Sequence, residues 1–341
     1  MRNKNIDVLR FLGLSMIILA HVFPPDWLFQ LRNFDVPLMI LVSGMSFVQS
    51  HKPEPYTSYV GKRFKRLVLP VWIFLTGYFL VDRIIWFAPD QLKPAVILDS
   101  YALLEGIGFV WVIRVFLLVA LTAPFVFAVN ERISSNRIYL VLLAVLYLLY
   151  ELFLATVRPF DDGILGQLFS FYICYTSGFS LIFALGIRLN RLTRKQCVLL
   201  GIGFLVVFLA CAFWYGRGAD GFVGTQKFKY PPRIYYLSYA LAVSSLAIAA
   251  APLVCSALAR QKVIESVIFF IAQNSLWIYL WHIPMLQVYY RVNQPFWVEY
   301  FMVYSGAACM AFAQSVLIRK CILPFIANDR FKKNILALLT G

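Results

Sequence analysis

The sequence predicts an all-α integral membrane protein: a bundle of about ten transmembrane helices, N-in and C-in, that forms one domain over residues 1–341. Three observations predict this fold class. Hydrophobic residues make up 61% of the chain and charged residues only 14%, whereas soluble domains are about half apolar and a quarter charged. Apolar runs long enough to span a bilayer recur along the whole length. Lys and Arg residues concentrate in alternate connecting segments.

The predicted helices follow one another with short connections. The second is short, so tilt or local thinning of the bilayer has to supplement it. The first is not followed by a small-residue cleavage site, so we interpret it as a retained helix rather than a signal peptide. The expected ranges are 6–23, 36–50, 67–88, 107–129, 138–156, 165–187, 197–215, 234–258, 267–288 and 297–318.

The distribution of basic residues predicts the orientation. With the N-terminus in the cytoplasm, the cytoplasmic segments carry twenty Lys and Arg residues, the opposite segments carry eight, and three lie within spans. This is the bias expected of a multi-pass protein. The net charge of +15 is therefore mostly a signal of topology, and it gives little reason to expect nucleic-acid binding.

Several classes of site are not predicted. The six cysteines lie in or beside apolar segments and none forms a C-x-x-C pair, so we expect neither a disulfide framework nor a metal site. The sequence shows no convincing internal repeat and no phosphate-binding loop, dinucleotide fingerprint, zinc-protease motif or serine-hydrolase elbow.

The first helix contains an arginine and a histidine eleven positions apart, Arg10 and His21. A helix turns 100° per residue, so the two side chains share one face to within about 20° and are about 16 Å apart along the axis. The stripe between them is apolar. Such a face suits a narrow tunnel with polar ends. The alternatives are a snorkelling Arg10 paired with Asp7 and an interfacial His21 at the helix end before Pro24.

Asp35 stands at the predicted outer start of the second helix, after a short hairpin from His21. The two side chains should therefore lie at a similar membrane depth. A carboxylate beside an imidazole fixes its tautomer and stabilises the imidazolium, which is what a general base requires. Asp35 also suits an N-cap, and the two roles are compatible.

Basic residues cluster before the predicted third helix, in GKRFKRLVLP (residues 61–70). Anchoring on the cytoplasmic side explains them. They also suit a phosphate-binding cluster, because arginine can grip phosphate oxygens with two donors. Its members include Lys62, Arg63 and Arg66.

Arg114 lies in the predicted outer third of the fourth helix. A buried guanidinium there needs a partner. It either forms a structural ion pair, for which Asp35 is a candidate, or steadies negative charge on a reacting carbonyl oxygen.

The outer loop over residues 216–233, GRGADGFVGTQKFKYPPR, is Gly-rich and basic on the predicted non-cytoplasmic side. Either it is a solvated loop that was translocated despite its charge, or it is a surface that meets an anionic or polyhydroxylated partner. The sequence leaves both readings open.

Taken together, these residues resemble the membrane-bound acyltransferase family 3, which includes glycan O-acetyltransferases. The resemblance begins with NIDVLRFLGLSMIILAH, which has the family's Arg-x10-His pattern, and continues with VPLMILVSGMSF and with Arg63-Phe-Lys-Arg66 as an Arg-x-x-Arg motif. Late in the chain, IAQNSLWIYLWHIPML (residues 271–286) is similar to the family's Asn-Ser-Leu…Tyr-Leu-x-His-x-Pro signature. The ordered set covers nearly the whole chain. The chain departs from the family in lacking Phe-Phe before Ser-Gly and in having an acidic residue at position 35.

The resemblance implies an O-acyltransferase of the bacterial inner membrane, with acetyl-CoA or a related acyl-CoA as cytoplasmic donor and a hydroxyl of a cell-surface or lipid-linked glycan as acceptor. Arg10, Lys62, Arg63 and Arg66 would hold the phosphates of the donor, and His21 would take the hydroxyl proton. Direct transfer and an acyl-histidine intermediate are both open.

In the ninth predicted helix, Tyr279 and His282 are neighbours on one face. They either line the acceptor pocket or belong to an aromatic belt with the nearby tryptophans. The acceptor sugar, the acyl length and the oligomeric state are left open, a homo-oligomer included.

Two other function classes compete. A transporter or flippase for a lipid-linked glycan would use the same intramembrane charges as a substrate path, although the inverted repeats of transporters are not apparent. A membrane sensor or scaffold would leave the buried charges unexplained.

Overall fold

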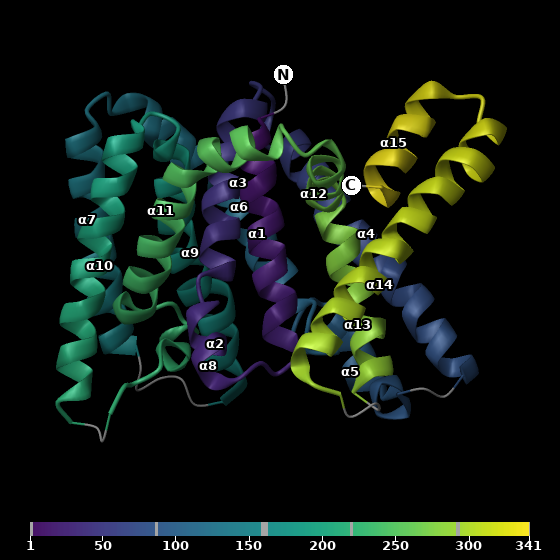
Figure 1. The fold of residues 1–341 in the computed structure, drawn as a ribbon, viewed down its shortest axis with the longest axis horizontal. Coiled ribbons are helices and arrows are strands. Elements are labelled where there is room, and N and C mark those ends of the chain that lie inside the picture. Colours follow the sequence, from purple (N-terminus) through teal and green to yellow (C-terminus); the bar gives the residue numbers. More distant parts are fainter. Residues whose placement is uncertain (1–2, 86–87, 158–162, 219–220, 291–293, 341) are drawn as a thin grey trace. The chain divides into compact units, whose positions relative to one another are not determined.

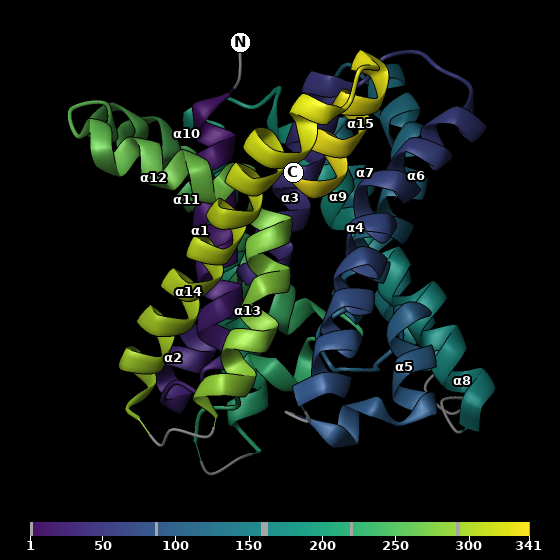
Figure 2. The ribbon, with the colours of Figure 1, turned by 90° about the vertical axis from the view of Figure 1, so that its right-hand side faces the viewer.

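The computed structural model describes residues 3–85, 88–157, 163–218, 221–290 and 294–340. Within these ranges every regular element is helical, which confirms the predicted class (Figures 1 and 2). The α-helices are α1 Lys4–His21, α2 Asp26–Leu31, α3 Asp35–Ser50, α4 Tyr56–Ile85, α5 Pro94–Tyr101, α6 Trp111–Arg132, α7 Asn136–Val157, α8 Gly163–Phe169, α9 Tyr175–Leu189, α10 Arg194–Gly216, α11 Ile234–Leu258, α12 Lys262–Gln273, α13 Ser275–Tyr289, α14 Phe296–Leu317 and α15 Asp329–Leu339.

The described part of the chain contains eight helices long and apolar enough to cross a membrane, or nine if the bent pair α12 and α13 is one span. The chain is therefore a multi-pass integral membrane protein. The predicted span that is not among these candidates is the first, 6–23. It corresponds to α1, which is formed but carries Lys4, Asp7 and Arg10 within its 18 residues. The predicted span 36–50 begins earlier, because α2 and α3 together make one candidate span, Asp26–Ser50. The sidedness of the two ends stays a prediction.

The chain folds into two compact units, each assembled from three stretches of sequence. Unit 1 comprises Met1–Ile17, Pro25–Pro53 and Leu118–Glu265, and unit 2 comprises Ile18–Pro24, Glu54–Leu117 and Ser266–Gly341. In unit 2, α13 and α14 lie side by side (Figures 1 and 2). The prediction that residues 1–341 act as one domain stays a prediction.

In unit 1, α3 and α9 pack with their backbones in direct contact, and two glycines allow it. A Cβ atom at Gly44 would collide with the α9 backbone at Phe183, and one at Gly186 would collide with the α3 backbone at Leu41. Small residues let membrane helices approach closely, because no side chain separates the backbones. Gly44, in the segment VSGMSF, therefore sets the packing of α3 on α9.

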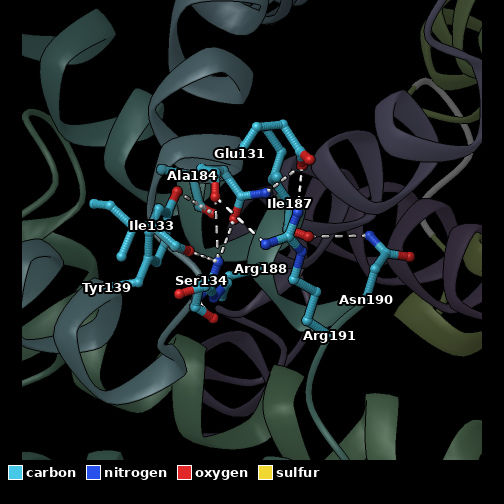
Figure 3. Close-up of polar contacts among 10 residues, drawn as sticks. Glu131, Ile133, Ser134, Tyr139, Ala184, Ile187, Arg188, Asn190 and Arg191 are labelled. Carbon is cyan, nitrogen blue, oxygen red and sulfur yellow. Dashed lines mark hydrogen bonds and ion pairs between the residues drawn. The ribbon is translucent and has the colours of Figure 1, made fainter.

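A buried arginine ties three segments of unit 1 together (Figure 3). The Arg188 side chain, in the last turn of α9, is fully buried. It donates to the Asn130 side-chain oxygen at 3.1 Å and to the carbonyls of Ile133 and Ser134 at 2.8 and 2.9 Å. Its guanidinium also lies 4.6 Å from the Tyr139 ring centroid. The expected helix range 165–187 leaves Arg188 in the following loop, and this is wrong, because α9 extends to Leu189. Arg188 instead satisfies carbonyl oxygens in the turn that follows α6, where helical hydrogen bonding has stopped.

Candidate active site

The candidate site in unit 2 begins where α1 ends. His21 is the last residue of α1 and is half-buried. The helix cannot continue, because Phe23 has a positive φ of 46° and Pro24 and Pro25 lack backbone N–H donors. A helix end also brings the imidazole near orphan carbonyls, whose dipole favours a cation. The predicted Arg-x10-His spacing thus lies within a single continuous helix.

The second element of the site is α13, which follows a sharp bend. α12 and α13 meet at 84°. Asn274, between them, donates its side-chain amide to the Phe270 carbonyl at 2.8 Å, which ties the bend to the end of α12. The segment Asn274-Ser275-Leu276 of the late signature is therefore the turn from which α13 starts, two turns before His282.

The two histidines face each other. His21 Nδ1 lies 3.0 Å from His282 Nε2. The rings stack with centroids 5.0 Å apart and planes 20° apart. The His282 side chain is fully buried, and its Nδ1 contacts the Tyr279 carbonyl. The geometry makes a hydrogen-bonded imidazole pair in which one ring is half-buried and the other is sealed from solvent.

Phe109 covers the imidazole pair from the loop before α6. Its ring meets both imidazoles edge-on, at 4.9 Å from His21 and 5.5 Å from His282. Tyr279 donates its hydroxyl to the Phe109 carbonyl at 2.6 Å, and Tyr290 donates to the His21 carbonyl at 2.8 Å. These bonds fix the backbone on either side of the rings, so both tyrosines hold the site together.

Arg114 acts on the same loop. Its side chain is buried, and Nη1 donates to the Leu103 carbonyl at 3.0 Å. Leu103, Gly106 and Gly108 all have positive φ, which makes the tight loop that presents Phe109. Arg114 therefore has a described role in shaping this loop. Stabilisation of an oxyanion by Arg114, and its pairing with Asp35, stay predictions.

In unit 1, Asp35 belongs to a separate buried cluster. Its carboxylate accepts from Arg32 Nη1 at 2.7 Å, from Lys229 Nζ at 3.1 Å and from the Val36 amide at 2.8 Å. The N-cap prediction is wrong by one residue, because Phe34 holds that position and Asp35 begins α3. Both carboxylate oxygens take part in this cluster, which gives Asp35 a structural role. Its action on His21 stays a prediction.

Lys229 belongs to the basic loop that the sequence predicts on the outer side, and its side chain packs against the rest of unit 1. In the predicted range 216–233, residues 219 and 220 lie outside the described residues. Lys229 is buried rather than displayed. Nearby, the Asn33 side chain donates to the Thr225 hydroxyl at 2.9 Å, and Arg233 forms an ion pair with Glu151 at 2.7 Å. Part of the loop's charge therefore serves to dock it onto unit 1.

Burial lowers the pKa of Lys229 from 10.5 to about 8, against the opposing effect of the Asp35 carboxylate. The folded protein releases this proton before the unfolded chain does, so the charged lysine costs stability below pH 8, and that cost disappears as the pH rises toward 10.5. We expect Lys229→Met, which keeps the Arg32–Asp35 pair, to be at least as stable as wild type at neutral pH. Its advantage should shrink as the pH rises.

Asp35→Asn is the matched comparison, because it leaves two buried cations and should cost about 3–5 kcal/mol. Thermal unfolding, followed by tryptophan fluorescence at neutral pH and near pH 10, measures the stability of the wild type, Lys229→Met and Asp35→Asn. A Lys229→Met protein less stable than Asp35→Asn at neutral pH would contradict this account.

Arg10 lies in unit 1 and is about one-third exposed. Its Nη2 donates to the Ser46 hydroxyl at 2.9 Å, and Nη1 lies 3.7 Å from the buried Asp7 carboxylate. The predicted Arg10–Asp7 proximity is therefore present. Ser46 was missed, although the run of serines at positions 43, 46 and 50 in an apolar helix was a signal that one face of α3 is polar.

The basic cluster lies inside a helix. The prediction that it precedes the helix is wrong, because α4 already begins at Tyr56. Lys62 forms an ion pair with Glu54 at 2.5 Å, and the Arg63 guanidinium lies 4.9 Å from the Tyr59 ring centroid. Arg66 is exposed. Arg63 and Arg66 are i, i+3 neighbours, so they can present two guanidinium groups to one anionic group.

The comparisons with known proteins support one assignment. A family model described as an acyltransferase domain, Acyl_transf_3, matches residues 3–320. The comparisons with curated proteins and with solved structures found no match. The matched range contains His21, Phe109 and His282, together with Arg10 and the basic cluster of α4.

Proposed function

The chain belongs to the acyltransferase 3 family and is an acyltransferase, and on this premise we propose that it moves an acetyl or short acyl group from cytoplasmic acyl-CoA to a hydroxyl of a cell-surface or lipid-linked glycan. His21 is the general base in this proposal. The observation that carries it is the half-buried imidazole of His21 at the end of α1, hydrogen-bonded to a second imidazole. A bacterial inner membrane and an N-in, C-in orientation belong to the same proposal.

The reaction we propose is direct transfer. The acceptor oxygen attacks the thioester carbonyl carbon while His21 takes the hydroxyl proton. The C–S bond then breaks, and the CoA thiolate receives the proton from the imidazolium. The products are an O-acyl ester and free CoA, so atoms and charges balance. Arg114 or backbone N–H groups would stabilise the negative charge that develops on the carbonyl oxygen.

The donor would be held by its phosphates. Exposed basic side chains on α4 suit phosphate oxygens, because guanidinium and ammonium groups form charge-assisted hydrogen bonds with them. We assign Lys62, Arg63 and Arg66 to this role, and Arg10 on the strength of its motif. Tyr279 would shape the acceptor pocket through its bond to the Phe109 carbonyl.

The experiment that tests the proposal is mass spectrometry of surface glycans from cells with and without the gene, complemented by the wild-type protein. We expect each repeating unit to lose one acyl group when the gene is absent. The mass difference identifies the acyl group, and fragmentation identifies the sugar. A flippase would instead be favoured if most of the glycan disappeared from the surface while the glycan that remained had the same mass as in wild-type cells.

Removing both arginines of the α4 pair, Arg63→Ala with Arg66→Ala, should weaken acetyl-CoA binding at least tenfold, since each lost charge-assisted contact is worth roughly 1.5–3 kcal/mol. Isothermal titration calorimetry of the purified protein measures the affinity. The control is Arg132→Ala with Arg137→Ala, which removes the same charge from exposed positions on the predicted cytoplasmic side. Equal affinity in the two double variants would show that the α4 cluster only anchors the chain.

A further inference from the structure

We infer that His282 is a positioning residue that fixes the tautomer of His21, so that Nδ1 of His21 carries its proton and Nε2 presents the lone pair. The importance of that lone pair for catalysis rests on the proposed role of His21 as base. The assignment of the protons rests on the geometry of the pair alone. The inference also gives His282 a new role: it positions His21 instead of lining the acceptor pocket, which was one of its two predicted roles.

The first step fixes one nitrogen of His282. Its Nδ1 contacts the Tyr279 carbonyl oxygen, three residues earlier on α13. A carbonyl oxygen only accepts hydrogen bonds, so the contact requires a proton on Nδ1. Both groups belong to the same turn of α13, so the contact is local to this helix.

The second step concerns the charge of His282. Its side chain is fully buried. Within the described part of the chain, its polar and ring contacts are His21, the rings of Phe109 and Tyr279, and the Tyr279 carbonyl, and none of these is a carboxylate. An imidazolium without an anionic partner is costly in such surroundings. His282 is therefore neutral, and its Nε2 carries a lone pair.

The third step transfers this constraint to His21. His282 Nε2 can only accept, and it lies 3.0 Å from His21 Nδ1. His21 Nδ1 must therefore be the donor. In a neutral imidazole the other nitrogen then holds the lone pair, so Nε2 of His21 is the basic atom. The order of donors is His21 Nδ1 to His282 Nε2, and His282 Nδ1 to the Tyr279 carbonyl.

The same order of bonds has a consequence for the proposed reaction. When Nε2 of His21 takes a proton, the ring becomes cationic, and its Nδ1–H bond to the neutral His282 strengthens as a charge-assisted bond. The proton has no reason to move on, because it would create a cation at the more deeply buried ring. It stays on His21, available for the thiolate. His282 thus does by hydrogen bonding and ring packing what a carboxylate does in other histidine sites.

Nitrogen NMR tests the proton assignment directly. The chain has three histidines, His21, His51 and His282, so selective ¹⁵N-histidine labelling gives six ring-nitrogen signals. His51→Gln in unit 1 removes two of them and aids assignment. In the wild-type protein in nanodiscs near neutral pH, we expect a directly bonded proton on Nδ1 of both His21 and His282, and none on either Nε2. A protonated Nε2 on His21, or a doubly protonated His282, would overturn the inference.

Two variants separate positioning from mere packing. His282→Gln places an amide oxygen near the position of Nε2 and can still accept from His21, whereas His282→Phe keeps a ring without an acceptor. We expect His282→Phe to lower kcat by about 10²–10⁴-fold, which is the contribution of a general base and at its upper end the loss caused by a wrong histidine tautomer. The KM for acyl-CoA should stay within about twofold. His282→Gln should retain more activity and the Nδ1–H signal of His21.

Equal kcat in His282→Phe and wild type would contradict the positioning role. The NMR result also separates this inference from the proposed function. Protons placed as expected, together with full acyl transfer by a His21 variant, would leave the pairing intact and remove the base. Protons placed otherwise, together with an inactive His21 variant, would overturn the pairing and leave His21 as the base.

Discussion

We expect His21→Gln to lose nearly all acyl transfer in a protein that still folds. Glutamine keeps a polar side chain of similar length but has no basic nitrogen near neutral pH. A positioned general base contributes about 10²–10⁴-fold to a rate, so kcat should fall by at least about a hundredfold. His21→Ala should be equally inactive, because both substitutions remove the basic nitrogen. Acyl transfer is measured from labelled acetyl-CoA to the acceptor glycan, at saturating donor.

The matched control is His51→Gln. His51 follows α3 in unit 1, where its ring packs 4.9 Å from Phe47 and 4.6 Å from Phe127, centroid to centroid. This variant loses an imidazole of the same chemistry in a place to which we assign no reaction. Folding of all variants is checked by monodispersity in detergent. Full transfer activity in a monodisperse His21→Gln protein would remove His21 as the base.

Arg188→Ala is expected to cause a large loss of stability. The guanidinium donates to the Asn130 side chain. It also donates to the carbonyls of Ile133 and Ser134, in the turn after α6 (Figure 3). Arg188→Ala removes one hydrogen bond to the buried Asn130 side chain and two to part-buried carbonyls. A buried acceptor left without a donor costs about 1–3 kcal/mol and a hydrogen bond from a charged group contributes about 1.5–3 kcal/mol, so the free energy of unfolding should fall by roughly 3 kcal/mol. Arg188→Lys should recover part of it, since an ammonium reaches fewer of these oxygens.

Arg191→Ala is the control for Arg188→Ala. Arg191 lies three residues later and pairs with Glu131 at 2.5 Å, where both side chains are about one-third to one-half exposed. Exposed ion pairs contribute about 0–1 kcal/mol, so this variant should unfold close to wild type. The midpoint of heat unfolding in detergent, followed by tryptophan fluorescence, ranks the three proteins. Comparable losses for Arg188→Ala and Arg191→Ala would mean that the buried network is not what stabilises this end of α6.

Hydrophobicity and the order of short motifs were enough to predict the helical class, most of the candidate membrane spans and the family. They were enough because bilayer thickness dictates the length of an apolar helix, and because proline stops α1 directly after His21. The approach of His282 to His21 was not predictable. The two residues are 261 positions apart, and their distance depends on how α13 leaves the bend at Asn274.

Charges were the least predictable feature, because the same residue type serves loops, ion pairs and helix ends. The buried Arg188 lies beyond the expected range 165–187, yet it belongs to α9 and donates to carbonyls in the turn after α6. Lys229 was counted as part of an exposed loop but inserts beside Asp35. In both cases the deciding factor is a backbone or side-chain acceptor supplied by a distant segment, which local sequence does not reveal.

The Gly44–Gly186 crossing has a consequence for a residue that neither glycine touches. Ser46 lies two positions after Gly44, about 200° around α3, so it points away from α9 and toward Arg10, to which it is hydrogen-bonded. A single methyl group added at position 44 would push α3 outward, and the hydroxyl that holds the arginine would travel with it. A substitution that changes no polar atom can thus displace Arg10, to which we assign a role in binding the donor's phosphates.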